Sequence, residues 1–227
     1  MIQAQFDLLL AHVAPKVDDI VRAKQEYFAQ TGGEVHEDDR CFESRLQGFF
    51  NWYLFDRKQQ DGTTPAQRYL QEQGTNLTAE DKDVLMGFTQ TRLSLYEYRG
   101  RKGFFLRRPK RGLVRVRDIV AGKVFDVTER RQMHGLEIGD IFEARLVPVG
   151  GTWHFSTSFT YHPREQKPVI LREIKRRKKQ GQIDVHALAW ELERMSLQAE
   201  RFKNVNIDAI YNFQNPFLGP RKTAAHG

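Results

Sequence analysis

The sequence predicts an α+β protein in which a small antiparallel β-barrel, SH3-like or OB-like, lies between helical segments. Apolar residues recur at spacings of three and four in residues 4–90 and again after residue 168, which indicates amphipathic helices. Between residues 93 and 162 they alternate with polar residues, which indicates strands. The strands are short and joined by glycine-containing turns, as in small barrels. We therefore expect a helical region (1–91), a barrel (92–163), C-terminal helices (164–213) and a basic flexible tail (214–227).

The helical region begins with a pattern over residues 4–30 that is interrupted near Ala14. Pro15 has no backbone N–H group, so it is expected to break the helix and to open a second one. A third helix is expected over about residues 40–58. Asp38 and Asp39 would cap its start and complement the helix dipole. Aromatic residues are so dense in this helix that they cannot share one stripe, so we expect neighbours on most of its sides.

Two further helix starts carry capping signals. Thr64 precedes Pro65, a residue favoured at the first position of a helix, and Gly74 follows nine residues later. Thr78 is followed by Asp81 at capping-box spacing. Both threonines are predicted N-caps of short helices.

The barrel segment shows strand periodicity from Leu93 onward. In residues 113–119, Val114 and Val116 point to one face, while Arg115 and Arg117 point to the other. Gly150-Gly151 predicts a hairpin turn, because glycine accepts positive φ at both positions. In the strand that follows, the odd-numbered residues from Trp153 to Tyr161 form the face that barrel closure would bury, and the even-numbered polar residues form the other face.

The C-terminal segment predicts two helices. The first begins near Pro168 and ends at Gly181, and the second is capped by Asp184 and continues to about residue 203. The apolar residues of the second helix keep an i, i+3, i+4, i+7 rhythm. That helix is therefore expected to pack on this chain or on a protein partner.

The charge distribution is the main functional signal. The net charge is +7, but residues 1–98 carry ten Lys/Arg against sixteen Asp/Glu, so the excess of positive charge lies after residue 98. Residues 99–117 contain nine Lys/Arg and no acidic residue, and a second basic cluster lies at 175–179. Clustered cations of this kind indicate a polyanionic partner.

We therefore predict a non-enzymatic binding protein for RNA or DNA. Cations neutralise phosphates, and two phenylalanines within the basic run would stack on unpaired bases. The predicted nucleic-acid-binding residues are Arg99, Arg101, Lys102, Phe104, Phe105, Arg107, Arg108, Lys110, Arg111, Arg115, Arg117, Lys175, Arg176, Arg177, Lys178 and Lys179. RNA is favoured over duplex DNA because no helix-turn-helix or other major-groove reader is recognisable.

No catalytic, metal or membrane signature accompanies this pattern. Neither a nucleophile elbow nor a phosphate-binding P-loop occurs, so we predict no catalytic residues, no cofactor and no enzymatic activity. The stretch from His36 to Cys41 offers potential ligands, but no second ligand pair follows at helical spacing, so no metal is predicted. The single cysteine and the lack of a long apolar run or a basic leader predict a cytoplasmic protein that does not enter the membrane.

Three segments carry a resemblance. They are residues 49–57 (FFNWYLFDR), 62–65 (GTTP) and 139–150 (GDIFEARLVPVG). Together they resemble a feature of uncharacterised bacterial proteins, some of which carry a C-terminal zinc-chelating SEC-C motif. That motif needs several cysteines, and Cys41 is the only one here, so the resemblance implies no zinc site and no activity.

A protein–protein adaptor is the alternative interpretation. In that case the aromatic helical half and the amphipathic helix at 185–203 would dock partners, and the basic clusters would meet acidic protein surfaces. An exposed apolar patch on that helix would favour the adaptor. A continuous positive surface on the barrel would favour nucleic acid.

Overall fold

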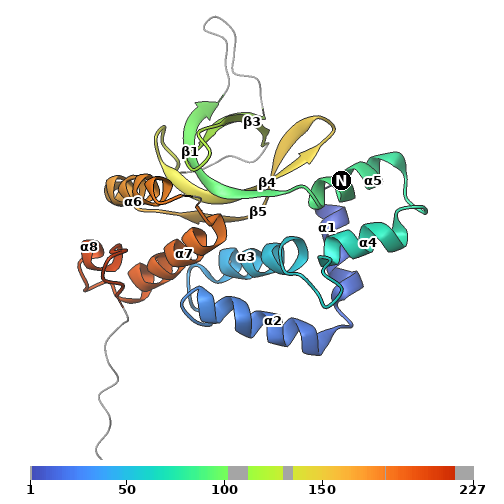
Figure 1. Cartoon of the computed structure of the whole chain (residues 1–227), viewed down its shortest axis with the longest axis horizontal. Helices are drawn as coiled ribbons and strands as arrows, with labels where there is room; N and C mark the ends of the chain where they lie inside the picture. Colours follow the sequence, from blue (N-terminus) through green and yellow to red (C-terminus); the bar gives the residue numbers. More distant parts are fainter. Residues whose placement is uncertain (1, 102–111, 130–134, 182, 218–227) are drawn as a thin grey trace, which may run out of the picture.

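The computed structural model describes residues 2–101, 112–129, 135–181 and 183–217. In these residues helices from both ends of the chain pack against one five-stranded sheet (Figure 1). The α-helices are α1 (Ile2–Val13), α2 (Val17–Gln30), α3 (Phe42–Phe55), α4 (Pro65–Gln73), α5 (Ala79–Phe88), α6 (Lys167–Lys179), α7 (Val185–Arg201) and α8 (Ile207–Ile210), with a 3₁₀ turn η1 (Arg164–Gln166). The strands are β1 (Arg92–Arg101), β2 (Leu113–Asp118), β3 (Val124–Thr128), β4 (Ile141–Val149) and β5 (Thr152–Tyr161).

The sheet closes into a barrel in the order β1-β2-β3-β5-β4, with β4 pairing back to β1. Four of the five pairings are antiparallel, but β3 and β5 run parallel, with Val127 beside Trp153. The prediction of an antiparallel barrel is therefore wrong at this one junction, and the sheet is mixed. Because β3 and β5 are separated by the whole of β4, local sequence patterns contain no signal for their relative direction.

Several local predictions are confirmed. The N-terminal pattern is two helices with a break at residues 14–16. Thr64 caps α4 in a reciprocal capping box with Gln67, and Thr78 and Asp184 accept backbone hydrogen bonds at the starts of α5 and α7. Gly150 and Gly151 both adopt positive φ in the β4–β5 hairpin.

The predicted start of the third helix is wrong. Helix α3 begins at Phe42, and its N-cap Cys41 makes no side-chain capping bond. Asp39 instead accepts a hydrogen bond from the His36 backbone and forms an ion pair with Arg201, 2.7 Å away. The carboxylate therefore ties the segment before α3 to the end of α7.

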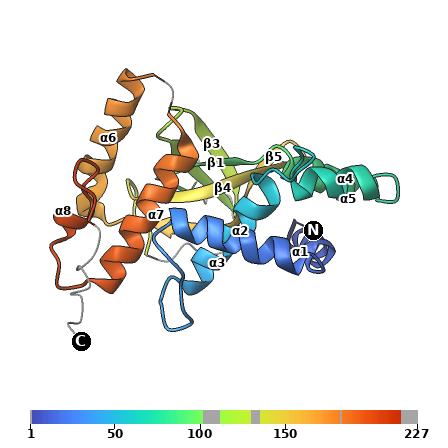
Figure 2. The same cartoon turned by 60° about the horizontal axis from the view of Figure 1, so that its bottom comes forward.

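Three apolar clusters hold the layers together. One fills the barrel and includes Tyr96, Phe142 and Phe155. A second joins α1–α5 to β4, where the missing side chain of Gly87 lets α5 lie against the Pro148 carbonyl. The third joins α6, α7 and α8 to the barrel (Figure 2). Helices therefore cover the outside of the barrel from two sides.

Strand β5 differs from the expected alternation. Its polar residues Ser156 and Thr160 are buried, while Tyr161 is half exposed. The cause is α3, which packs on the outer surface of β5: Asn51 on α3 accepts a hydrogen bond from Ser156 and donates one to Thr157. The polarity of the even-numbered residues predicted that this face of β5 is exposed to solvent. The hydrogen bonds with Asn51 satisfy polar groups of β5, so α3 can cover this face.

Candidate functional site

The first predicted binding region is the β1–β2 hairpin. Seven of its predicted residues lie outside the described part of the chain, namely Lys102, Phe104, Phe105, Arg107, Arg108, Lys110 and Arg111. The segment that contains them connects the end of β1, at Arg101, to the start of β2, at Leu113. The most basic stretch of the sequence is therefore one connection at one end of the barrel.

The described cations of this hairpin are Arg99, Arg101, Arg115 and Arg117, and all four are exposed. Arg99 contacts Glu97 at 2.8 Å, and Arg115 contacts its cross-strand neighbour Asp126 at 2.9 Å. Arg117 is exposed and forms no ion pair within the described residues. Alternation along β2 is as predicted, because Val114 and Val116 are fully buried while Arg115 and Arg117 are exposed.

The second predicted cluster lies on α6, and two of its five cations form ion pairs within the described residues. Arg176 and Arg177 both bind the buried carboxylate of Glu173 at 2.6 Å, and Arg177 also binds Glu191 at 2.7 Å. The Arg177 guanidinium also lies over the ring of Phe213. Lys175 and Lys179 are exposed. Arg177 therefore fastens α6 to α7 and to the C-terminal segment.

The two basic clusters lie toward opposite ends of β2. Lys178 donates to the carbonyl of Ile119, the residue that follows β2, whereas the 102–111 connection enters β2 at its start. Six residues of strand separate these ends by roughly 17 Å. Arg115 and Arg117 lie between them on the outer face of β2.

Helix α7 does not offer the apolar surface that the adaptor interpretation requires. Its buried residues include Leu188, Leu192, Met195 and Leu197, and they pack against α2, β1, β5 and α8. Among the described residues of α7, none of the large apolar side chains is exposed. The amphipathic pattern therefore reflects packing within this chain.

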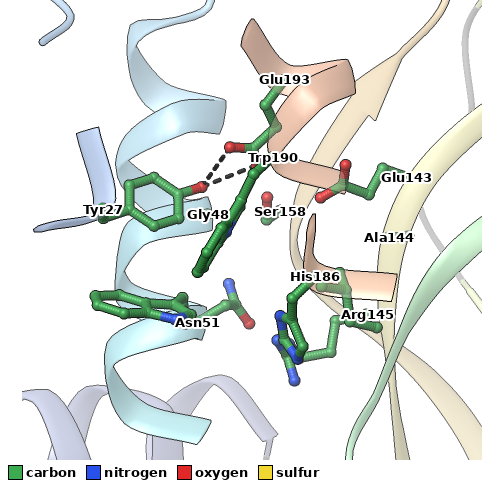
Figure 3. Close-up of a pocket in the computed structure, with 12 residues that line it drawn as sticks. Tyr27, Gly48, Asn51, Glu143, Ala144, Arg145, Ser158, His186, Trp190 and Glu193 are labelled. Atoms are coloured by element: carbon green, nitrogen blue, oxygen red, sulfur yellow. Dashed lines mark hydrogen bonds between the residues drawn. The ribbon is translucent and has the colours of Figure 1, made fainter. Parts of the chain in front are cut away.

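A second candidate site, which the sequence reasoning missed, is a polar pocket between β4, α2, α3 and α7 (Figure 3). Tyr27 and Glu193 face one another across it, and the Tyr27 hydroxyl donates to the Glu193 carboxylate at 2.8 Å. Glu143, from the outer face of β4, points into the same space (Figure 3). Its Oε2 atom is buried and has no hydrogen-bond partner among the described residues.

Burial controls the electrostatics of this pocket. It raises the pKa of Glu143 well above its ordinary value, and the neighbouring Glu193 raises it further. The pKa of Glu193 is also raised by burial, but Arg45 opposes the shift by binding Glu193 at 3.2 Å. Arg45 in turn donates to the Thr31 carbonyl and hydroxyl. Arg45 therefore favours the ionised form of Glu193, while burial and the charge of Glu193 favour the neutral form of Glu143.

The rest of the pocket is lined by Arg145, His186, Asn51 and two tryptophans. Arg145 is 3% exposed and pairs with Asp56, which also lies 3.7 Å from His186. The cavity has a volume of about 20 Å³, which is room for about one water molecule. The pocket is therefore too small for a substrate. Its charged side chains instead pair with one another across the junction between the barrel and the helices. The sequence did contain a signal for this pocket. Glu143 and Arg145 are charged residues that alternate with apolar residues in a strand that is otherwise hydrophobic.

Neither a cluster of metal ligands nor a membrane-crossing helix occurs in the described residues. They contain no cluster of three or more His, Cys, Asp or Glu side chains able to hold a metal ion. No described helix combines the length and the hydrophobicity that crossing a membrane requires.

Comparison with known proteins identifies the family of this chain. No curated protein sequence matches the chain, and no solved structure matches it. The profile of a family of unknown function (DUF7986) matches residues 18–189, a range that runs from the start of α2 into α7 and includes the whole barrel. The chain therefore belongs to this family of unknown function, DUF7986.

Proposed function

We propose that this protein binds nucleic acid, RNA in preference to DNA, through the basic β1–β2 side of its barrel, and that it acts by binding rather than by catalysis. One observation carries the proposal. The most basic segment of the sequence is the hairpin between the first two strands of a closed five-stranded barrel. The two strands that it joins, β1 and β2, pair antiparallel, so they meet the connection at one end of the barrel, where we propose that a polyanion binds.

The strand order supports an OB-type barrel rather than an SH3-type one. OB barrels have five strands, and their third and fifth strands pair in parallel, as β3 and β5 do here. OB folds bind oligonucleotides on the face of strands 2 and 3 and with the loops between strands 1 and 2 and between strands 4 and 5. In this chain those loops are the basic connection at 102–112 and the short turn at Gly150-Gly151.

The charge on the strand face is modest, so the connection has to supply most of the phosphate contacts. Arg99 and Arg115 are each compensated by an acid, and Arg117 adds one uncompensated cation. Residues 102–111 add five Lys/Arg without an acid, together with Phe104 and Phe105. Cations that neutralise phosphates and aromatic rings that stack on unpaired bases are the two elements of single-strand binding.

Within this proposal, Lys175 and Lys179 on α6 extend the surface, whereas Arg176 and Arg177 act mainly in packing. We also propose a cytoplasmic location, which the single cysteine supports because it fits a reducing compartment. The relation to bacterial proteins with a SEC-C motif stays a prediction.

Fluorescence anisotropy with single-stranded RNA, duplex RNA and duplex DNA tests the proposal. We expect the tightest binding to single-stranded RNA. Arg117→Gln should weaken it about 3-fold to 10-fold, because one phosphate contact is lost. Lys24→Gln, which removes the same charge from α2, is the matched control and should leave affinity unchanged.

Two outcomes would contradict the proposal. One is the absence of binding to all three nucleic acids at about 50 mM salt, conditions that favour phosphate contacts. The other is an equal effect of Arg117→Gln and Lys24→Gln, which would indicate that only net charge matters. Either result would favour the alternative of a protein–protein adaptor. Cross-linking to acidic partner proteins would then test that alternative.

A further inference from the structure

A second cationic region lies on the helical half of the molecule, away from the barrel. It is an open groove of about 500 Å³ formed by the start of α2, the segment that follows α3, and α4. Five cations line it: Lys16, Arg22, Arg57, Lys58 and Arg68. Residues 1–98 contain only ten Lys/Arg and are acidic overall, so the fold gathers half of these cations in one groove.

Acidic residues cancel part of this charge: Asp19 and Glu26 pair with Arg57, and Asp61 pairs with Arg68, so the five cations exceed these three acids by two. Both carboxylate oxygens of Asp19 are occupied, since they accept hydrogen bonds from Arg57 at 3.0 and 3.2 Å and from the Tyr53 hydroxyl at 2.9 Å. These donors hold the pKa of Asp19 below its ordinary value, against the opposing effect of its partial burial. Arg57 also binds Glu26, so its guanidinium is a fixed part of the wall.

Several donors in the groove remain available to a ligand. Lys16 forms no ion pair within the described residues, and Arg22 is 67% exposed with a single acidic neighbour 3.7 Å away. Arg68 uses one nitrogen to bind Asp61 at 2.6 Å, which leaves its other N–H groups free.

Gln59 provides an independent observation. Its Nε2 atom is buried and donates to no acceptor among the described residues. The backbone of Gln59 is held by hydrogen bonds with Thr63 and Gly62, so the side chain is positioned by an ordered turn. A buried amide donor without an acceptor costs free energy, and an anion in the groove would supply the acceptor.

We propose that this groove binds the phosphate group of a small phosphorylated molecule, with Lys16, Arg22, Arg68 and the Gln59 amide as donors. Phosphate offers several acceptor oxygens and more than one negative charge, which suits four convergent donors better than a carboxylate does. The volume lies within the range of small-molecule sites, so the groove has room for the group that carries the phosphate. The site lies on helices and is independent of the nucleic-acid surface.

Isothermal titration calorimetry at constant ionic strength tests the site, with inorganic phosphate, a nucleoside monophosphate and the matching nucleoside as ligands. Phosphate and the monophosphate should bind saturably, whereas the nucleoside should not. Tighter binding of the monophosphate would identify a phosphorylated small molecule rather than free phosphate as the ligand. Lys16→Gln and Arg68→Gln should each weaken phosphate binding about 10-fold, and Gln59→Ala about 3-fold.

Lys24→Gln, on the same helix but outside the groove, should bind phosphate like the unchanged protein. The groove variants should also keep their affinity for single-stranded RNA, so a failure here and a failure of the nucleic-acid proposal are distinguishable. Absence of saturable phosphate binding, or equal affinity in Lys16→Gln and Lys24→Gln, would overturn the proposal.

Discussion

At the scale of single residues, the buried carboxyl pair of Glu143 and Glu193 is the least expected feature. The charged groups around it are Arg45 from α3, Arg145 from β4, Glu193 from α7 and Asp56 after α3. The positive charges of Arg45 and Arg145 balance the negative charges of Glu193 and Asp56. An ionised Glu143 would add an uncompensated charge in a dry site, which is costly, so burial favours its neutral form.

This assignment predicts a pH dependence of stability. Glu143 has a pKa well above its ordinary 4.5 in the folded protein, so unfolding above that pH releases its proton. The free energy of unfolding should fall by about 1.4 kcal/mol per pH unit until the folded-state pKa is reached. Buried His162, whose pKa is lowered to about 4 by burial, contributes the opposite slope below pH 6.5. Above pH 6.5 the His162 contribution is absent, so the slope there comes from the coupled pair of Glu143 and Glu193.

Glu143→Gln, an isosteric and permanently neutral variant, should remove this slope and be more stable than the unchanged protein at pH 8. Urea denaturation at intervals between pH 6.5 and 9 measures it. Glu193→Gln is the control. It deprives buried Arg45 of its carboxylate and should destabilise the fold by about 3 kcal/mol at every pH. Parallel pH profiles for Glu143→Gln and the unchanged protein would show that Glu143 is ionised.

Gly48 gives a second test at this scale. It lies inside α3, where glycine costs about 1 kcal/mol relative to alanine. A Cβ at this position would lie 2.6 Å from the Tyr27 hydroxyl and 3.3 Å from Glu193. Gly48→Ala should therefore destabilise the protein by about 1–3 kcal/mol despite its better helix propensity.

The double variant Gly48→Ala with Tyr27→Phe tests the stated cause. Removal of the hydroxyl should recover part of the loss, because it is the atom nearest to the added methyl group. Thermal denaturation of the two single variants and the double variant gives the coupling. Strict additivity would mean that the clash lies elsewhere.

At the scale of elements, the N-caps of the helices show which features local sequence can predict. Thr64 accepts from the Gln67 backbone, and the Gln67 side chain accepts from the Thr64 backbone. Thr64→Ala should cost about 1 kcal/mol, while Thr64→Ser keeps the hydroxyl and should cost less than half as much. Chemical denaturation compares the two. Equal losses would mean that the methyl group of this buried threonine, rather than its capping bond, stabilises α4.

The starts of α4, α5 and α7 could be predicted because each cap bonds to a residue three positions away. Asp39 could not be assigned in this way. Its partner Arg201 lies 162 positions later in the sequence, so its pairing depends on how α7 returns to the N-terminal helices. Helix α6 shows the same limit. Its basic residues predict an exposed cationic surface, because the sequence does not reveal that Glu191 of α7 lies beside Arg177.

At the scale of the whole molecule, a small barrel between helices could be predicted from periodicity, but the parallel pairing of β3 with β5 that completes it could not. The direction of β3 relative to β5 depends on the path of the chain between them. The candidate sites divide in the same way. The basic hairpin is a run of neighbours in the sequence. The Glu143 pocket instead joins residues from six elements, and the cation-lined groove joins α2, α4 and the segment after α3.

The central claim is that the 102–111 connection contacts the phosphates of a nucleic acid. The most direct measurement is the salt dependence of single-stranded RNA binding, compared with a variant in which Arg107, Arg108, Lys110 and Arg111 are replaced by Glu. For single strands each lost phosphate contact lowers the slope of log K against log salt by about 0.7, so the slope should shrink by about 3. Reversal of Lys24, Arg40 and Lys203, exposed cations of the helical segments, should change it by less than about 1. An unchanged slope in the 102–111 variant would contradict the claim.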